Sequence, residues 1–179
     1  MREPEELLLK LRAESTRREA FPLLVKEFQQ RVYSIVRKMV IDHDDADDIV
    51  QEVFVKVWNN IENFKGDSGL FTWIYRIATN ESLQYLRKRK RQSWFKTNIS
   101  EELENALVSD LDVDADEIQL KLQKAILRLP DKQRLVFNLK YFEELTYEEI
   151  AEITDSTVGS LKASFHHATR KIEEFLKEN

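Results

Sequence analysis

The sequence has no cysteine, and its 179 residues include three glycines and three prolines. Without cysteine the chain has no disulfide framework, no thiolate nucleophile and no cysteine-based zinc site. So few glycines and prolines argue against an all-β fold. The apolar run from Leu7 to Leu11 is interrupted by Lys10, and no stretch approaches the roughly 18 apolar residues of a membrane span. We therefore expect an all-α, cytoplasmic protein with no direct membrane insertion.

The net charge of −5 is distributed unevenly along the chain. Residues 93–118 carry one Lys against eight Asp and Glu, whereas residues 1–92 and 119–179 are nearly balanced. The acids in the middle stretch are spaced without helical periodicity, which is typical of a mobile connector. We expect two small helical domains, 1–92 and 119–179, joined by an acidic flexible linker at 93–118.

Apolar residues recur at three- and four-residue spacing in the first domain, which predicts long helices. The first covers about 21–39, and Thr16 with Glu19 is an expected capping box for its start. The second begins near a cluster of aspartates and covers about 44–61, because carboxylates suit a helix N-terminus. The third covers about 69–91.

Residues 63–91 join a glycine-containing loop to an aromatic helix that ends in five consecutive basic residues. This order favours single-stranded nucleic acid, because each base stacked on an aromatic face contributes about 1 to 3 kcal/mol while cations follow the phosphates. The alternative for the basic run is a solvated helix end, where cations are also favourable. The spacing of Trp73 favours the core over base contact, whereas Phe64 and Phe71 suit either role.

The second domain has the pattern of a helix-turn-helix. A helix is expected to start at Pro130, and Thr146 with Glu149 is expected to form a capping box for the next one. A short turn at 154–156 then precedes the last helix. In such a pair the second helix enters the major groove of DNA and reads base edges with its N-terminal part. Many helical hairpins with this pattern are purely structural.

These segments resemble one family in order along the chain. The string DADDIVQEVFVKVWNNIENFKGDSGLFTWIYRIATNESLQYLRKRKR is similar to the second conserved region of bacterial sigma factors, in the extracytoplasmic-function (ECF) group of the sigma-70 family. The strings LRLPDKQRLVF, LTYEEIAEI and VGSLKASFHHA resemble the fourth region. The resemblance implies a factor that binds core RNA polymerase, directs it to promoters and helps to melt the −10 element.

The resemblance also implies three sets of contact residues. The polymerase clamp helices would meet Asp48, Gln51, Glu52 and Asn59. The melted −10 strand would meet Phe64, Lys65, Asp67, Ser68, Phe71, Trp73, Arg76, Asn80, Arg87 and Lys88. The −35 duplex would meet Thr157, Ser160, Lys162, Ala163, Ser164, His166, His167 and Arg170.

Two features refine these expectations. Ser164, His167 and Thr169 stand where recognition helices of the family often carry Arg, so we expect weak −35 binding by the isolated domain and a shallow salt dependence. In the family the linker threads toward the polymerase active centre. Its negative charge resembles that of the nucleic acid, which later takes its place there. The alternative is a soluble tether.

The resemblance implies three partners. The first is core RNA polymerase, which would be contacted at its clamp helices and flap. The others are promoter DNA, bound as a −35 duplex and a −10 single strand, and an anti-sigma factor. We expect no catalysis, small-molecule substrate, cofactor or metal. The adjacent His166 and His167 diverge by about 100° on a helix and are poor metal ligands, and no nucleophile motif occurs. Two alternatives stay open: an autonomous helix-turn-helix regulator that needs no polymerase, and a single-strand RNA-binding or adaptor protein.

Overall fold

The computed structural model describes residues 5–66, 68–92 and 117–178. Every regular element in these ranges is helical, which confirms the all-α prediction. The order is α1 (Glu5–Arg12), α2 (Glu14–Val40), α3 (His43–Asn60), the 3-10 turn η1 (Ile61–Asn63), α4 (Leu70–Gln92), α6 (Glu117–Leu127), α7 (Asp131–Tyr141), α8 (Tyr147–Thr154) and α9 (Val158–Glu178). The predicted linker falls almost entirely outside the described residues, so it stays a prediction. Within the described ranges, no helix has the length and apolarity needed to cross a membrane.

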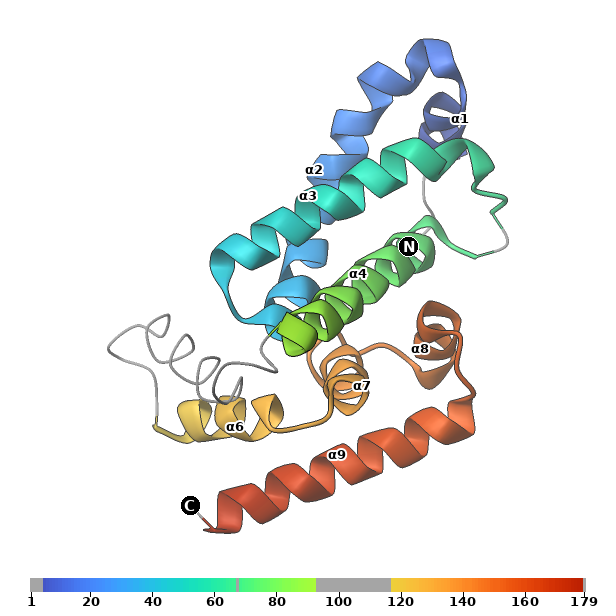
Figure 1. Ribbon diagram of the computed structural model, residues 1–179. Coiled ribbons are helices and arrows are strands. Elements are labelled where there is room, and N and C mark those ends of the chain that lie inside the picture. The colour runs from blue at the N-terminus through green and yellow to red at the C-terminus, as the bar shows by residue number, and fades with distance from the viewer. Residues whose placement is uncertain (1–4, 67, 93–116, 179) are drawn as a thin grey trace.

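Helices α2, α3 and α4 pack against one another, and α1 lies against α2 and η1 (Figure 1). The predicted apolar stripe of α2 is its buried face, with Leu24, Val32 and Met39 fully buried. In α4 the buried residues include Ile74 and Leu86. Burial of such side chains contributes about 1.5 to 3 kcal/mol each relative to exposure, which is what holds these helices together.

The helix starts agree only partly with the sequence. The capping box expected at Thr16 and Glu19 is wrong, because α2 begins at Glu14 and its first turn carries no side-chain cap. The Thr16 hydroxyl instead donates to the Lys10 carbonyl at 2.8 Å. Since α1 ends next to the start of α2, its last carbonyls need partners and Thr16 supplies one. The cap of α3 is Asp42, which accepts from the Asp45 amide at 3.0 Å.

The starts of the later helices agree with the sequence. Helix α7 follows Pro130 directly. Thr146 and Glu149 form the predicted capping box of α8. Asp155 then turns the chain into α9 with the left-handed backbone that a turn residue needs, at φ 51° and ψ 49°. A short polar side chain such as Asp reaches this conformation at a lower cost than most residues.

The two halves of the chain pack together through α7 and α8 of the second half and α2 and α4 of the first (Figure 1). Helix α8 contacts α4, and α7 contacts both α2 and α4. As a result, Leu139, Ile150 and Leu161 belong to the same buried cluster as Ile74 and Val36. The sequence left the relative orientation of the two halves open, because apolar periodicity shows which face of a helix is buried but not against what.

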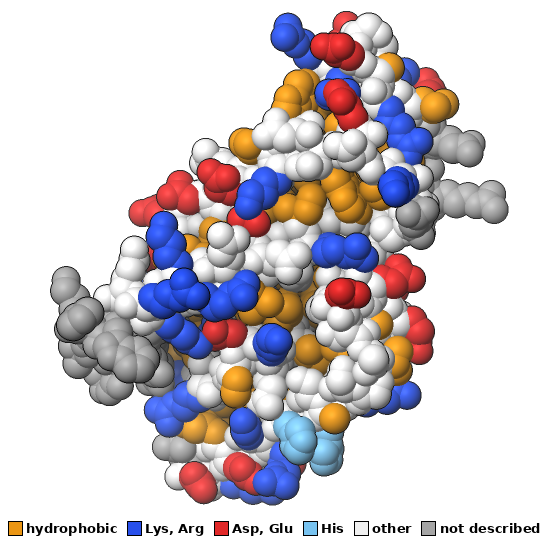
Figure 2. Space-filling model, turned by 45° about the vertical axis from the view of Figure 1, so that its right-hand side comes forward, with side chains coloured by type: hydrophobic (Ala, Val, Ile, Leu, Met, Phe, Trp, Pro, Cys, Tyr) orange, Lys and Arg blue, Asp and Glu red, His pale blue; other side chains and the backbone are white. Residues whose placement is uncertain are grey.

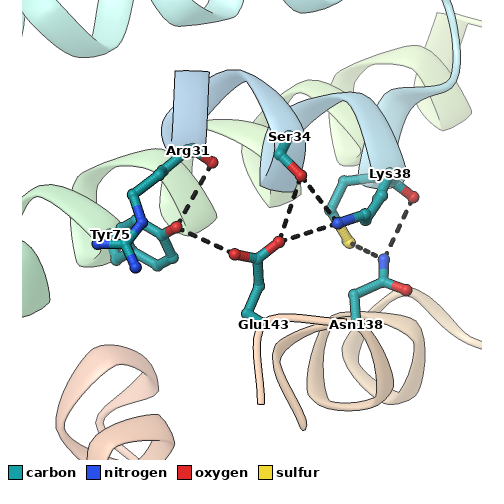
Figure 3. Close-up of polar contacts among 7 residues, drawn as sticks. Arg31, Ser34, Lys38, Tyr75, Asn138 and Glu143 are labelled. Carbon is teal, nitrogen blue, oxygen red and sulfur yellow. Dashed lines mark hydrogen bonds and ion pairs between the residues drawn. The ribbon is translucent and has the colours of Figure 1, made fainter. Parts of the chain in front are cut away.

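A polar cluster crosses the same boundary (Figure 3). The carboxylate of Glu143, just after α7, accepts from the Lys38 ammonium at 2.9 Å and from the Ser34 hydroxyl and Tyr75 phenol at 3.3 Å each. The Asn138 amide donates to the Lys38 carbonyl at 3.2 Å. Burial, together with the adjacent carboxylate of Glu143, raises the pKa of Tyr75 far above its ordinary value. Tyr75 is therefore a neutral donor at any physiological pH.

Candidate polymerase and nucleic-acid interfaces

The outer face of α3 carries the residues predicted to meet the polymerase. Asp48, Gln51, Glu52 and Asn59 are all exposed, and their spacing places them on one side of the helix. Val55 lies on this side as well and is 53% exposed. A single exposed apolar side chain is ordinary on a protein surface, so Val55 extends the predicted face without adding independent evidence for it. Val55 could have been found from its position four residues after Gln51.

A hollow of about 300 Å³ lies between the end of α3 and the first half of α4. We call it the α3–α4 hollow. Its lining combines an apolar surface with amides and one ion pair, and consists of Lys56, Asn60, Asn63, Trp73, Ile77, Asn80 and Glu81. Of these, the sequence singled out Trp73 and Asn80 as contacts. Asn63 begins the segment predicted to meet a single strand but was not named as a contact. The others were missed, although 56 and 60 lie one turn apart on α3, and 73, 77 and 80 lie on successive turns of α4.

The hollow has the chemistry of a site for a planar polar ring. Trp73 and Ile77 are half-buried and supply an apolar surface. Asn80 is exposed, and a side-chain amide both donates and accepts hydrogen bonds. Lys56 and Glu81 pair at 2.5 Å across the two helices. An aromatic face beside amide groups is what a flipped nucleobase needs, because it can stack and be read along its edge.

The 63–69 loop is built around a buried ring. Phe64 is 6% exposed, and its ring centroid lies 5.1 Å from that of Trp73. The Phe64 ring therefore packs against a residue that lines the hollow and presents little surface of its own. Lys65 is exposed and Ser68 half-buried, whereas Asp67 lies outside the described residues.

Phe71 is also tied into the fold. It is half-buried, its ring lies 4.1 Å from that of Tyr75, and the Arg31 guanidinium stands 5.2 Å from its centroid. Of the three aromatic residues predicted for the −10 strand, Trp73 is the one that lines the hollow.

Arg76, predicted to face the strand, contacts the second half of the chain. Its Nε and Nη2 atoms donate to the Glu152 carbonyl at 3.1 and 2.6 Å. This carbonyl belongs to the last turn of α8, where helix carbonyls lack intrahelical partners. Arg76 therefore caps the C-terminal end of α8 in this arrangement, although its side chain stays exposed.

The basic run at the end of α4 is divided between ion pairs and solvent. Arg89 pairs with Asp45 at 3.3 Å and Lys90 with Asp131 at 2.7 Å. Arg87 and Lys88, the two predicted strand contacts, are exposed. Lys and Arg side chains gather in a patch on the face shown in Figure 2. A local cationic surface of this kind can follow phosphates despite the negative net charge.

Tyr85 links the same end of α4 to the start of α3. Its hydroxyl donates to the Asp45 carboxylate. Burial raises the pKa of Tyr85 to about 12, and the hydrogen bond to Asp45 adds to the shift. The phenol therefore stays protonated and keeps α4 bound to the start of α3.

The outward surface of α9 carries most of the residues predicted for the −35 duplex. Ser164 is half-buried, and the exposed members are Thr157, Ser160, Lys162, Ala163, His166, His167 and Arg170. Thr157 caps the helix by accepting from the Ser160 amide at 3.2 Å. Arg170 pairs with Glu174 at 3.1 Å. Among the described residues, no group of three or more His, Asp or Glu side chains is placed to hold a metal ion.

Comparison with known proteins identifies the family. Residues 24–92 match the family model Sigma-70 region 2, and residues 119–172 match Sigma-70, region 4. The ECF RNA polymerase sigma-E factor of Haemophilus influenzae is 34% identical over 165 residues, which cover 87% of each chain. The RNA polymerase sigma-H factor of Pseudomonas aeruginosa is 31% identical, over 88% of this chain and 86% of that one. The chain belongs to the ECF group of the sigma-70 family.

Solved structures share the fold of this ECF sigma factor. RpoE of Bartonella quintana, in a complex with the anti-sigma factor NepR, superposes with a TM-score of 0.69 at 22% identity, over 88% of this chain and 96% of that one. CnrH, in a complex with the cytosolic domain of CnrY, gives 0.68 at 20% identity, over 97% and 96%. The ECF sigma factor SigW of Bacillus subtilis is 29% identical over 97% of this chain and 99% of its own. This chain is thus a sigma factor, which serves RNA polymerase in promoter recognition.

Proposed function

We propose that this sigma factor docks core RNA polymerase through the outer face of α3 and captures one base of the opened −10 strand in the α3–α4 hollow. The observation that carries the proposal is the hollow itself, which joins the aromatic face of Trp73 to the exposed amide of Asn80. The basic end of α4 lies on the same helix and supplies cations for the phosphates. Helix α4 thus carries both one wall of the hollow and the basic run.

The energetics of base capture support this role. Extruding a base costs a few kcal/mol of unstacking. Stacking on an aromatic side chain contributes about 1 to 3 kcal/mol, and a base edge held by an Asn amide contributes discrimination of a similar size. One well-held base therefore roughly offsets its own extrusion, and the polymerase supplies the rest of the opening.

For the −35 element we propose a contact with the exposed surface of α9. The N-terminal half of α9 carries Ser160, Ala163 and His167 on that surface, and Arg170 is paired with Glu174. With few unpaired cations the surface contributes few phosphate contacts, so binding by this half alone is weak. Stable promoter recognition then needs both halves on the polymerase, whose flap would hold the second.

The remaining assignments follow from membership of the family. We propose domain limits of 1–92 and 119–179, an acidic linker between them and a cytoplasmic location beside the polymerase. The chain itself would carry out no catalysis, because strand synthesis belongs to the polymerase. An anti-sigma partner is proposed because RpoE of Bartonella quintana was solved with the anti-sigma factor NepR, and CnrH was solved with the cytosolic domain of CnrY.

The test is transcription from a promoter library with purified chain and bacterial core polymerase. We expect start-site-specific transcripts that depend on both components. If no such transcript forms while the chain alone shifts a specific duplex, the alternative of an autonomous helix-turn-helix regulator is correct and this proposal is wrong.

A further inference from the structure

Two arginines near the N-terminus form a hydrogen bond and an ion pair with the chain segment that leads into α4. Arg12 lies at the end of α1 and Arg17 near the start of α2. Both precede the stretch that matches sigma-70 region 2. Their targets lie in η1 and in the 63–69 loop, about fifty residues later, beside the α3–α4 hollow.

Arg12 holds the loop through its backbone. Its Nη2 atom donates to the Phe64 carbonyl at 2.5 Å, and the guanidinium carbon lies 5.8 Å from the Phe64 ring centroid. Two residues later Gly66 has a positive φ of 84°. A side chain there would bring its Cβ atom to 3.6 Å from the same Arg12 nitrogen. The loop therefore follows the guanidinium closely.

Arg17 fixes the position from which Arg12 acts. It is 8% exposed, and it donates to the carbonyls of Leu11 at 2.9 Å and Arg12 at 3.2 Å. The same guanidinium pairs with Glu62 of η1 at 2.5 Å and lies 5.7 Å from the Trp58 ring. Arg17 thus connects the end of α1 to η1 and to α3. Arg12, at the end of α1, is therefore held in place relative to α3 and to the loop that follows η1.

The loop in turn supports the hollow. The Phe64 ring packs against Trp73 with centroids 5.1 Å apart and the planes tilted by 39°. Trp73 lines the hollow. A displacement of Phe64 would therefore shift the aromatic surface on which a base would stack. Packed rings transmit such a shift, because protein interiors have little free volume.

We propose that Arg12 is a positioning residue for base capture. It holds Phe64, and Phe64 holds the Trp73 ring at the angle that a flipped base requires. This role rests on the proposed function of the α3–α4 hollow. Arg12 touches no DNA; its effect passes through the loop.

The substitution Arg12→Ala tests the idea in reconstituted holoenzyme. We expect promoter opening on duplex DNA to slow by about tenfold, the effect expected when one charged hydrogen bond is lost. Opening is followed by permanganate reactivity of thymines in the −10 element. Core affinity is measured on the same samples and is expected to match the wild type. The melting temperature is expected to fall by only a few degrees, because one hydrogen bond of an exposed side chain is lost.

Three further variants sharpen the test. Arg12→Lys keeps a cationic donor and is expected to recover most of the rate. Phe64→Leu keeps an apolar side chain but removes the aromatic contact to Trp73, so it is expected to lose the rate as Arg12→Ala does. Arg18→Ala is the matched control, because Arg18 is an exposed arginine in the same segment; it is expected to behave as wild type.

A premelted −10 template separates positioning from general stability. The wild type is expected to bind a template with the captured base intact more tightly than one with an abasic site there, and Arg12→Ala is expected to lose that preference. Opening by Arg12→Ala at the wild-type rate, or an equal loss on both templates, would overturn the positioning role. If the wild type itself shows no preference, the proposed function of the hollow fails instead.

Discussion

Lys38 of α2 and Glu143 after α7 form an ion pair of 2.9 Å between residues 105 positions apart in the sequence. Their side chains are 30% and 14% exposed, so water and salt screen the pair less than a surface pair. Tyr75 and Ser34 donate to the same carboxylate, which fills most of its acceptor positions. The pair therefore fixes α7 against the first half of the chain.

The first prediction concerns this ion pair. Glu143→Gln removes the charge that faces Lys38 and is expected to lower the free energy of unfolding by about 1 to 2 kcal/mol. The melting temperature should fall by roughly 2 to 8 °C. Glu144→Gln makes the same chemical change at an exposed neighbour and is expected to stay within about 0.5 kcal/mol of wild type. Calorimetry checks both; equal melting of the two variants would contradict the structural role of Glu143.

The second prediction concerns polymerase docking. Asp48→Arg or Glu52→Arg reverses an exposed charge on the outer face of α3, so an unfavourable charge would face the polymerase. We expect core affinity to fall by more than tenfold with unchanged melting. Glu27→Arg is the control, because Glu27 is an exposed acid on α2 outside the proposed interface. Co-purification with core polymerase is the measurement. If the α3 variants co-purify with core polymerase as well as the Glu27 variant does, the docking surface lies elsewhere.

The sequence predicts the helices of this protein well, because their signals are local. Thr146 and Glu149 lie three residues apart, and one turn of helix brings them together. Pro130 acts on its own backbone. The box at Thr16 is the exception, because the interrupted apolar run from Leu7 to Leu11 did not predict α1, whose end takes the Thr16 hydroxyl.

The candidate site could be predicted less completely, because part of it depends on contacts between distant segments. Trp73 and Asn80 follow from one motif, yet the hollow that they line also needs Lys56 and its partner Glu81 from two helices. Likewise, Arg76 lies on the expected face of α4, and its bond to Glu152 arises from docking of α8. Helical periodicity carries no information about such docking.

The third prediction concerns the base in the hollow. Asn80→Ala removes an exposed amide from the lining and is expected to reduce discrimination at one −10 position by about 1 to 3 kcal/mol. Gln84→Ala, one turn further along α4, removes a similar amide outside the lining and is expected to leave discrimination unchanged. Opening rates on promoters with each of the four bases at that position provide the measurement. A uniform loss across all four bases would speak against edge recognition by Asn80.

The fourth prediction is a pH dependence at the start of α8. The Thr146 backbone amide, followed by its hydroxyl, donates to Glu149 and holds the pKa of that carboxylate below its ordinary value of 4.5. A lowered pKa means that the carboxylate stabilises the fold above pH 4.5 and loses this effect as the pH falls through the lowered pKa. Glu149→Ala should therefore destabilise the protein at pH 7 by about 0.5 to 1 kcal/mol, because it removes the Glu149 half of the capping box and leaves the Thr146 half. Denaturant unfolding at pH 7 and near pH 3 checks this: the gap between variant and wild type should narrow in acid, and a constant gap would mean that the carboxylate charge contributes nothing.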